Sequence, residues 1–156
     1  MSDLKRILLA EDSAADVELT LEALGEHRLA NEVVVVRDGA AVLDYLYRRG
    51  EHAGRSEGNP AVILLDLKMP KMDGLQVLRQ IKADESLRHV PVVMLTSSRE
   101  EQDLVESYRL GVNGYVVKPV DFGRFVEVVT QLGMFWAVVN EPPPGSVGRP
   151  ARNPSR

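Results

Sequence analysis

The chain has 156 residues, of which 44% are hydrophobic and 27% charged, a balance typical of one globular domain. Its formal net charge of -4 excludes a global basic field that would attract nucleic acid. The absence of cysteine excludes disulfides, thiolate metal sites and a cysteine nucleophile. The apolar run near the N-terminus is too short for a signal peptide or a membrane span, so we expect a soluble, cytoplasmic protein.

Apolar runs and helical patterns alternate along the chain. The expected strands are short apolar runs at 6–10, 32–36, 61–66, 90–96 and 114–118. The expected helices are 14–27, 39–49, 74–84, 99–111, closed by Gly111, and a long last helix from 121 to about 140. Residues 50–60 are rich in glycine and suggest a long exposed loop. We therefore expect a folded domain over 1–140 and a disordered Pro/Gly/Arg-rich tail over 141–156.

This alternation of strands and helices predicts an α/β fold with a parallel sheet covered by helices on both faces. The strands are almost continuously apolar, as is typical when both faces of a sheet are buried. The common arrangement at this length is a flavodoxin-like, doubly wound, five-stranded sheet with strand order 2-1-3-4-5. In such a sheet, ligands bind at the carboxyl ends of the strands.

Polar side chains stand at those carboxyl ends. Glu11 and Asp12 follow the first expected strand, Asp66 ends the third, Thr96 the fourth and Lys118 the fifth. Three carboxylates brought together repel one another, and a single ammonium offsets only one charge. A hard divalent cation such as Mg²⁺ would relieve the rest, and a carboxylate could then act as a nucleophile toward phosphorus.

The Glu11-Asp12 pair and the segments "LLDLKMPKMDG", "VVMLTS" and "YVVKP" together resemble the receiver domain of two-component response regulators, over residues 4–136. The resemblance implies that Asp66 accepts a phosphoryl group from a sensor histidine kinase and later loses it by slow hydrolysis. It also implies a Mg²⁺ site formed by Asp12, Glu11 through water, Asp66 and the backbone carbonyl of Lys68. A protein of this kind catalyses only its own phosphorylation and dephosphorylation.

The same resemblance assigns roles to three further residues. Thr96 and Lys118 would bind the phosphoryl oxygens, and Thr96 would signal the phosphorylated state together with an aromatic switch residue, Tyr115. The peptide bond between Lys118 and Pro119 is expected to be cis. Glu11 departs from the more common aspartate and lengthens one arm of the metal site by a methylene group.

A closer resemblance is to the stand-alone regulators paired with phytochrome-type light-sensing kinases. It rests on the long loop 50–60, the third strand, the segment "SYRLGVNGYVVKP" and the aromatic pair at 135–136. It implies a phytochrome-type kinase as partner. A phosphorelay intermediate or a chemotaxis-type regulator for another kinase is the alternative.

Rival functions on a similar fold have weaker support. A phosphatase or phosphotransferase of the haloacid-dehalogenase type needs a second acid two positions after the nucleophile, where this chain has Lys68. A nucleotide- or flavin-binding module needs a glycine-rich phosphate loop after the first strand, where "AEDSAAD" stands. A degenerate receiver that acts only as a scaffold would lack one of the reactive residues, and here every reactive position is filled.

The last expected helix carries two apolar stripes. One stripe suits packing on the sheet, and the second consists of Val128, Leu132, Phe135 and Val139. Because a helix on a sheet buries one stripe, the second would be exposed in a monomer and predicts a homodimer through this helix. The resemblance to the receiver family implies that the fourth helix and fifth strand also take part. The alternative is that the tail folds back and covers the second stripe. Too little chain follows Lys118 for a DNA-binding module, so we expect the signal to pass through conformational change, a partner or dimerisation.

Overall fold

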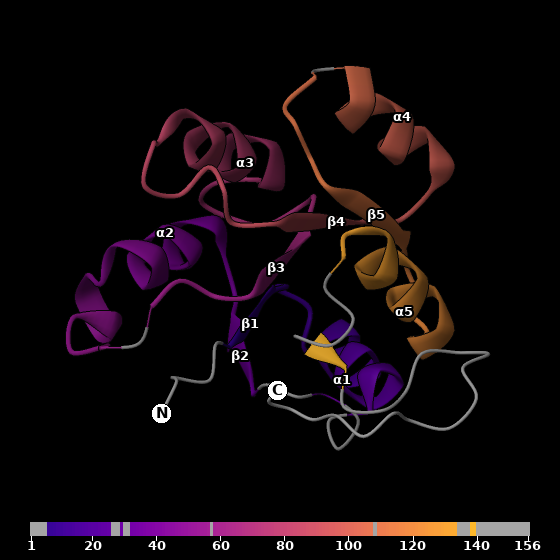
Figure 1. Ribbon diagram of the computed structural model, residues 1–156, viewed down its shortest axis with the longest axis horizontal. Helices are drawn as coiled ribbons and strands as arrows, with labels where there is room; N and C mark the ends of the chain where they lie inside the picture. Colours follow the sequence, from indigo (N-terminus) through magenta and orange to yellow (C-terminus); the bar gives the residue numbers. More distant parts are fainter. Residues whose placement is uncertain are drawn as a thin grey trace, which may run out of the picture.

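The computed structural model describes residues 6–25, 29, 32–56, 58–107, 109–133 and 138–139 (Figure 1). Helices and strands alternate through this part of the chain, as expected. The strands are β1 (Ile7–Ala10), β2 (Val33–Val36), β3 (Val62–Asp66), β4 (Val92–Thr96) and β5 (Gly114–Val117). The helices are α1 (Ala14–Leu24), α2 (Gly39–Tyr47), the short η2 (Gly50–His52), α3 (Gly74–Ala83), α4 (Arg99–Ser107) and α5 (Phe122–Gln131).

The strands form one parallel sheet in the order β2-β1-β3-β4-β5, which confirms the expected fold class. Ile7 of β1 pairs with Val33 on one side and Val62 on the other. The strand that ends in Asp66, β3, is central in this order, and Asp66 pairs with Leu95 of β4. All carboxyl ends therefore lie at the same edge of the sheet.

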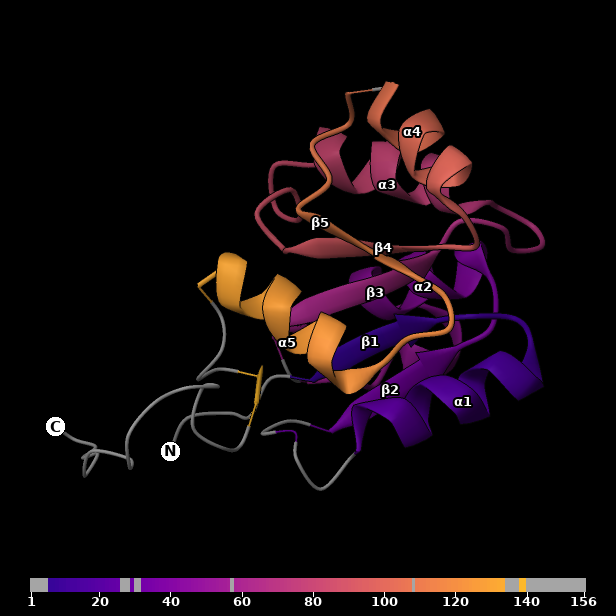
Figure 2. The same ribbon diagram turned by 90° about the vertical axis from the view of Figure 1, so that its right-hand side faces the viewer.

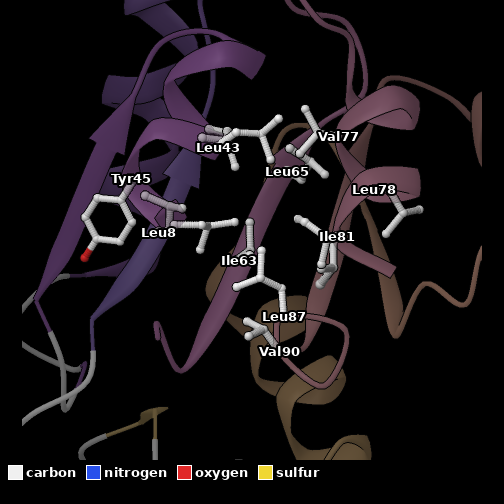
Figure 3. Packing of buried hydrophobic residues seen from close by; sticks show 14 of the residues in the cluster. Leu8, Leu43, Tyr45, Ile63, Leu65, Val77, Leu78, Ile81, Leu87 and Val90 are labelled. Atoms are coloured by element: carbon white, nitrogen blue, oxygen red, sulfur yellow. The ribbon is translucent and has the colours of Figure 1, made fainter. Parts of the chain in front are cut away.

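Helices cover both faces of the sheet. Figures 1 and 2 show α1 and α5 on one face and α2, α3 and α4 on the other. Side chains alternate between the faces along each strand: Leu64 packs in the cluster with Phe125 of α5, whereas Ile63 and Leu65 pack in the cluster with α2 and α3 (Figure 3). By this alternation, Asp66 continues the α1 and α5 face beyond the end of the buried core.

Short polar side chains begin the helices that follow the strands. Each accepts a hydrogen bond from a backbone N–H in the first turn, which otherwise has no partner inside the helix; these residues are Ser13, Asp38, Asp73 and Asp121. Ser13 starts α1 immediately after the acidic pair that follows β1. The first turn of α1 is thereby held close to the carboxyl edge of the sheet.

The last helix is shorter than expected, and the prediction of a helix to about residue 140 is wrong. Helix α5 ends at Gln131, and Gly133 has a φ of 73°, a left-handed conformation that glycine adopts readily. Val139 forms an antiparallel bridge with Leu29 and therefore lies against the body of the domain. The prediction that α4 is closed by Gly111 is also wrong, because α4 ends at Ser107.

The second apolar stripe is not exposed in the monomer. Val128 is 2% exposed and Val139 is 1% exposed, and Leu132 packs against the same hydrophobic cluster. Phe135, Trp136 and the expected tail 141–156 lie outside the described residues. The burial of Val128 and Val139 therefore removes the basis for a homodimer through this stripe, and the alternative that the tail covers it stays untested. Among the described helices, none combines the length and apolarity needed to cross a lipid bilayer.

Candidate functional site

Lys118 is the centre of a charged pocket at the carboxyl edge of the sheet. Its Nζ atom lies 3.0 Å from Glu11 Oε1, 3.1 Å from Asp66 Oδ1 and 3.1 Å from Asp16 Oδ2. The Glu11 and Asp66 side chains are almost fully buried, with 1% and 7% exposed. Burying charges is costly unless they are paired, so the ammonium is what allows two carboxylates to remain at this depth.

A third carboxylate completes an acidic cluster. Oxygen atoms of Glu11, Asp12 and Asp66 all lie within 4.8 Å of one another. Asp12 is exposed, so the cluster is open to solvent on one side. Carboxylate oxygens with open positions for water fit a hard divalent cation such as Mg²⁺. The three residues thus form an acidic metal-binding site, and the expected contribution of the Lys68 backbone carbonyl stays a prediction.

The pocket changes the acidity of Asp66. Burial raises the pKa of Asp66 to about 6, and the negative charge of Glu11 acts in the same direction, whereas Lys118 opposes both. At pH 7 and above the carboxylate is still mostly ionised. Near neutral pH Asp66 is therefore a charged, poorly solvated carboxylate, the ionisation state in which a carboxylate can act as a nucleophile.

Thr96 places an unused hydroxyl beside this pocket. The residue is fully buried at the end of β4, and its Oγ1 atom has no hydrogen-bond partner among the described residues. A buried hydroxyl without a partner costs about 1–3 kcal/mol. Such a cost is expected where a buried hydroxyl is kept available to donate a hydrogen bond to an oxygen atom of a ligand.

The loop after β3 is fixed by its two ends. Asp73 and Gln76 form a reciprocal capping box at the start of α3, so Asp73 is the N-cap residue of this helix. The Lys68 side chain points to solvent and pairs with Glu101 of α4 at 3.4 Å, with 80% of its surface exposed. Glu101 also accepts a hydrogen bond from the backbone N–H of Ser97 at 2.7 Å. The Lys68 side chain thus connects the loop after Asp66 with the loop after Thr96.

Comparison with known proteins identifies the family. Residues 7–130 match the response regulator receiver domain. The chain belongs to the response regulator receiver family. A receiver domain is a signalling module and not a conventional enzyme, which agrees with the expectation from the sequence.

Several relatives are similar over most of their length. A solved structure titled "Bacteriophytochrome response regulator RtBRR" is 64% identical, with a TM-score of 0.83, covering 92% of this chain and 87% of that one. "Response regulator Rcp1" of Synechocystis sp. is 40% identical over 85% of this chain and 88% of its own. A structure titled as the Mn(2+)-bound form of response regulator Rcp1 has a TM-score of 0.67 at 38% identity, covering 94% and 99%. "Probable methanogenesis regulatory protein FilR2" of Methanothrix harundinacea is 42% identical over 88% of this chain and 86% of its own.

Tyr115 lies in β5, and the Lys118–Pro119 peptide bond follows this strand directly. Lys118 and Pro119 are joined by a cis peptide bond, as expected. Tyr115 is half-buried in β5 opposite Met94 of β4, and both pack on the sheet face covered by α2, α3 and α4. Met94 precedes Thr96 by two residues, so Tyr115 and Thr96 lie toward the same face. Its role as a switch remains a prediction.

Sequence reasoning missed Asp16. This residue lies in the first turn of α1 and is one of the three carboxylates around Lys118. The prediction considered strand ends, and Asp16 belongs to a helix. The signal was available in the segment "EDSAAD", because Ser13 as an N-cap places the third following residue in the first helical turn.

Proposed function

We propose that this receiver domain accepts a phosphoryl group from a sensor histidine kinase on Asp66 and transmits the modified state to a partner. The observation that carries the proposal is the position of Lys118, 3.1 Å from Asp66 and 3.0 Å from Glu11, within a pocket that contains an acidic cluster. A cation held beside a nucleophilic carboxylate can stabilise the negative charge of a transferring phosphoryl group.

In the proposed reaction, an Asp66 carboxylate oxygen attacks the phosphorus of a phosphohistidine. The new oxygen–phosphorus bond forms as the phosphorus–nitrogen bond breaks, and the leaving imidazole takes a proton. Lys118 pairs with a phosphoryl oxygen, and the buried Thr96 hydroxyl donates to another, which gives that hydroxyl the partner it lacks. Later attack by water releases inorganic phosphate and restores the Asp66 carboxylate.

The metal site has a defined donor set in this proposal. Asp12 and Asp66 would ligate through carboxylate oxygens, Glu11 through water, and Lys68 through its backbone carbonyl. A bound Mg²⁺ ion would neutralise negative charge on the phosphoryl oxygens. The open, acidic donor set of Glu11, Asp12 and Asp66 supports this assignment.

The acceptor is tested by replacing Asp66 with asparagine, which keeps the size but removes the nucleophile. Acetyl phosphate and Mg²⁺ should add the mass of one phosphoryl group to the wild-type protein and to an Asp103→Asn control, which changes an exposed carboxylate of α4. The Asp66→Asn protein should gain nothing. Modification of the variant at the wild-type rate would assign the acceptor to another residue.

A phytochrome-type histidine kinase is the proposed partner. Its support is the 64% identity to a regulator titled as a bacteriophytochrome response regulator. The 42% identity to a regulator named for methanogenesis keeps a phosphorelay or another kinase as the rival. Phosphotransfer profiling against every histidine kinase of the source organism distinguishes the two partners. The cognate kinase should transfer its phosphoryl group to Asp66 much faster than all others.

Output through a homodimer is a further part of the proposal, now restricted to the α4 and β5 part of the expected interface. Leu104 of α4 and Val117 of β5 are large apolar residues that are 46% and 40% exposed. Light scattering with and without beryllofluoride should detect the dimer. Replacing Val117 with glutamate should then shift the protein to monomer. A wild-type protein that stays monomeric in both states would leave partner binding as the output.

A further inference from the structure

Asp16 forms an ion pair that the proposed reaction does not yet use. Its Oδ2 atom accepts a hydrogen bond from Lys118 Nζ at 3.1 Å, a distance close to those from Lys118 to Glu11 and Asp66. An ammonium has three N–H donors, and here three carboxylates surround it. We propose that Asp16 is a positioning residue, which holds the Lys118 ammonium in place for the phosphoryl group on Asp66. This inference rests on the proposed function of Asp66.

The three partners of Lys118 differ in what happens to them during the reaction. Asp66 becomes phosphorylated, and Glu11 belongs to the carboxylate cluster that would hold the metal. Asp16 is outside that cluster and lies nearer the solvent, with 39% of its side chain exposed. It is therefore the partner whose bond to Lys118 can persist while the other two change their interactions.

The start of α1 fixes Asp16 relative to Glu11. The backbone N–H of Ser13 donates to Glu11 Oε2, and the backbone N–H of Asp16 donates to Ser13 Oγ, both at 3.2 Å. The N-cap residue thus links the Glu11 carboxylate to the backbone of Asp16, whose own carboxylate contacts Lys118. Lysine has a long, flexible side chain, which loses conformational freedom when its ammonium group binds a phosphoryl oxygen. Because contacts on two sides already hold the Lys118 ammonium group, less of this freedom remains to be lost.

A simpler role for Asp16 is to stabilise the helix, because acidic residues near a helix N-terminus interact favourably with the helix dipole. That role predicts a loss of thermal stability and nothing specific at Lys118. The two roles therefore differ in one observable, the mobility of the Lys118 side chain.

The test compares Asp16→Ala, Asp16→Asn and a control, Glu18→Ala, which removes an exposed acid from the same helix. NMR relaxation of the Lys118 ε-methylene group is measured first, without metal or phosphate. We expect a lower order parameter in Asp16→Ala, and values close to wild type in Asp16→Asn, which retains an oxygen acceptor, and in Glu18→Ala. Beryllofluoride affinity in Mg²⁺ should then fall about fivefold in Asp16→Ala, as for one partly exposed ion pair, and little in the other two.

The outcomes separate this inference from the proposed function. An unchanged Lys118 order parameter in Asp16→Ala overturns the positioning role, whatever the phosphorylation results. Equal effects of Asp16→Asn and Asp16→Ala also overturn it, because they would assign the effect to charge and not to the hydrogen bond that holds the ammonium. Failure of wild-type Asp66 to become phosphorylated overturns the proposed function instead, and the order parameters still decide whether Asp16 holds Lys118.

Discussion

Gly74 lies directly against the backbone of Asp66. A β-carbon on Gly74 would be 2.4 Å from the Asp66 carbonyl oxygen and 2.9 Å from the Leu67 α-carbon, both of which are backbone atoms that cannot move aside cheaply. The Gly74 N–H also donates to the Leu67 carbonyl at 2.7 Å. The first residue of α3 therefore sets the position of the strand end that carries the proposed acceptor.

Replacing Gly74 with alanine should displace this strand end and destabilise the fold by about 1–3 kcal/mol, the usual cost of inserting a methyl group into a packed interior. Urea denaturation measures the loss. The control is Gly54→Ala, because a β-carbon at Gly54 meets no atom within 4 Å. If both variants were equally stable, the close contact at Gly74 would be relieved by a small backbone shift.

Thr96→Val should leave the unphosphorylated protein as stable as the wild type or about 1 kcal/mol more stable. Valine has a similar shape and removes a buried hydroxyl that has no partner in the described part of the chain. The same variant should bind beryllofluoride more weakly, because the proposed donor to a phosphoryl oxygen is lost. Urea denaturation measures the stability, and a beryllofluoride titration measures the affinity.

Thr96→Ser is the matched control for that variant. It keeps the hydroxyl and removes a buried methyl group, so it should be less stable than the wild type yet retain most beryllofluoride affinity. A large loss of stability in Thr96→Val would show instead that the hydroxyl is already bonded in the unphosphorylated state.

Asp66 should make metal-free stability depend on pH. Because burial raises the pKa of Asp66 to about 6 from the ordinary value of 3.8, the folded protein binds the proton more tightly than the unfolded chain does. The stabilisation of the fold by this proton binding is fully present below about pH 4 and is lost as the pH rises to about 6. The raised pKa of Lys118 lies far above this window, so Lys118 stays charged throughout.

Asp66→Asn removes this titration, so the variant should gain stability over the wild type between pH 4 and pH 7 in a chelating buffer. Thermal melts across that range give the difference between the two proteins. Taking the difference removes the contribution of carboxyl groups that titrate alike in both. A constant difference at every pH would contradict the raised pKa.

The three carboxylates should make stability depend on Mg²⁺. A ligand that binds only the folded state stabilises the fold by about 2.7 kcal/mol when its free concentration is 100 times its Kd. Asp12→Ala should lose most of this response, because it removes the exposed member of the cluster. The variant should also be at least as stable as the wild type without metal, because repulsion with the other two carboxylates is relieved. A full Mg²⁺ response in Asp12→Ala would exclude Asp12 as a ligand.

Val139→Asp tests whether Val139, the last member of the second apolar stripe, is buried within the monomer. Val139 is 1% exposed and bridges to Leu29, so burying a carboxylate there should cost at least about 2 kcal/mol in a monomer. Val117→Asp, at a position 40% exposed, should cost little. If Val139→Asp kept its stability and only changed the mass measured by light scattering, the residue would belong to an interface between two copies.

The strand ends could be predicted from the sequence because each is marked by a change from apolar to polar residues. A parallel sheet brings such ends to one edge, so Glu11, Asp66 and Lys118 followed from topology alone. Asp16 did not, because its approach to Lys118 depends on where α1 begins and on which sheet face it covers. The end of α5 was missed because the apolar spacing continues past Gly133, and only the backbone conformation of that glycine shows that the helix has stopped.

The ion pair between Lys118 and Glu11 joins residues 107 positions apart in the chain. The last strand delivers the ammonium, whereas the first strand delivers the acid, and β3 between them carries Asp66. A chain still emerging from the ribosome therefore lacks the complete pocket until nearly the whole domain has been synthesised and β5 has docked beside β4. If Asp66 accepts a phosphoryl group as proposed, a partly folded chain would therefore lack the ammonium that the reaction needs.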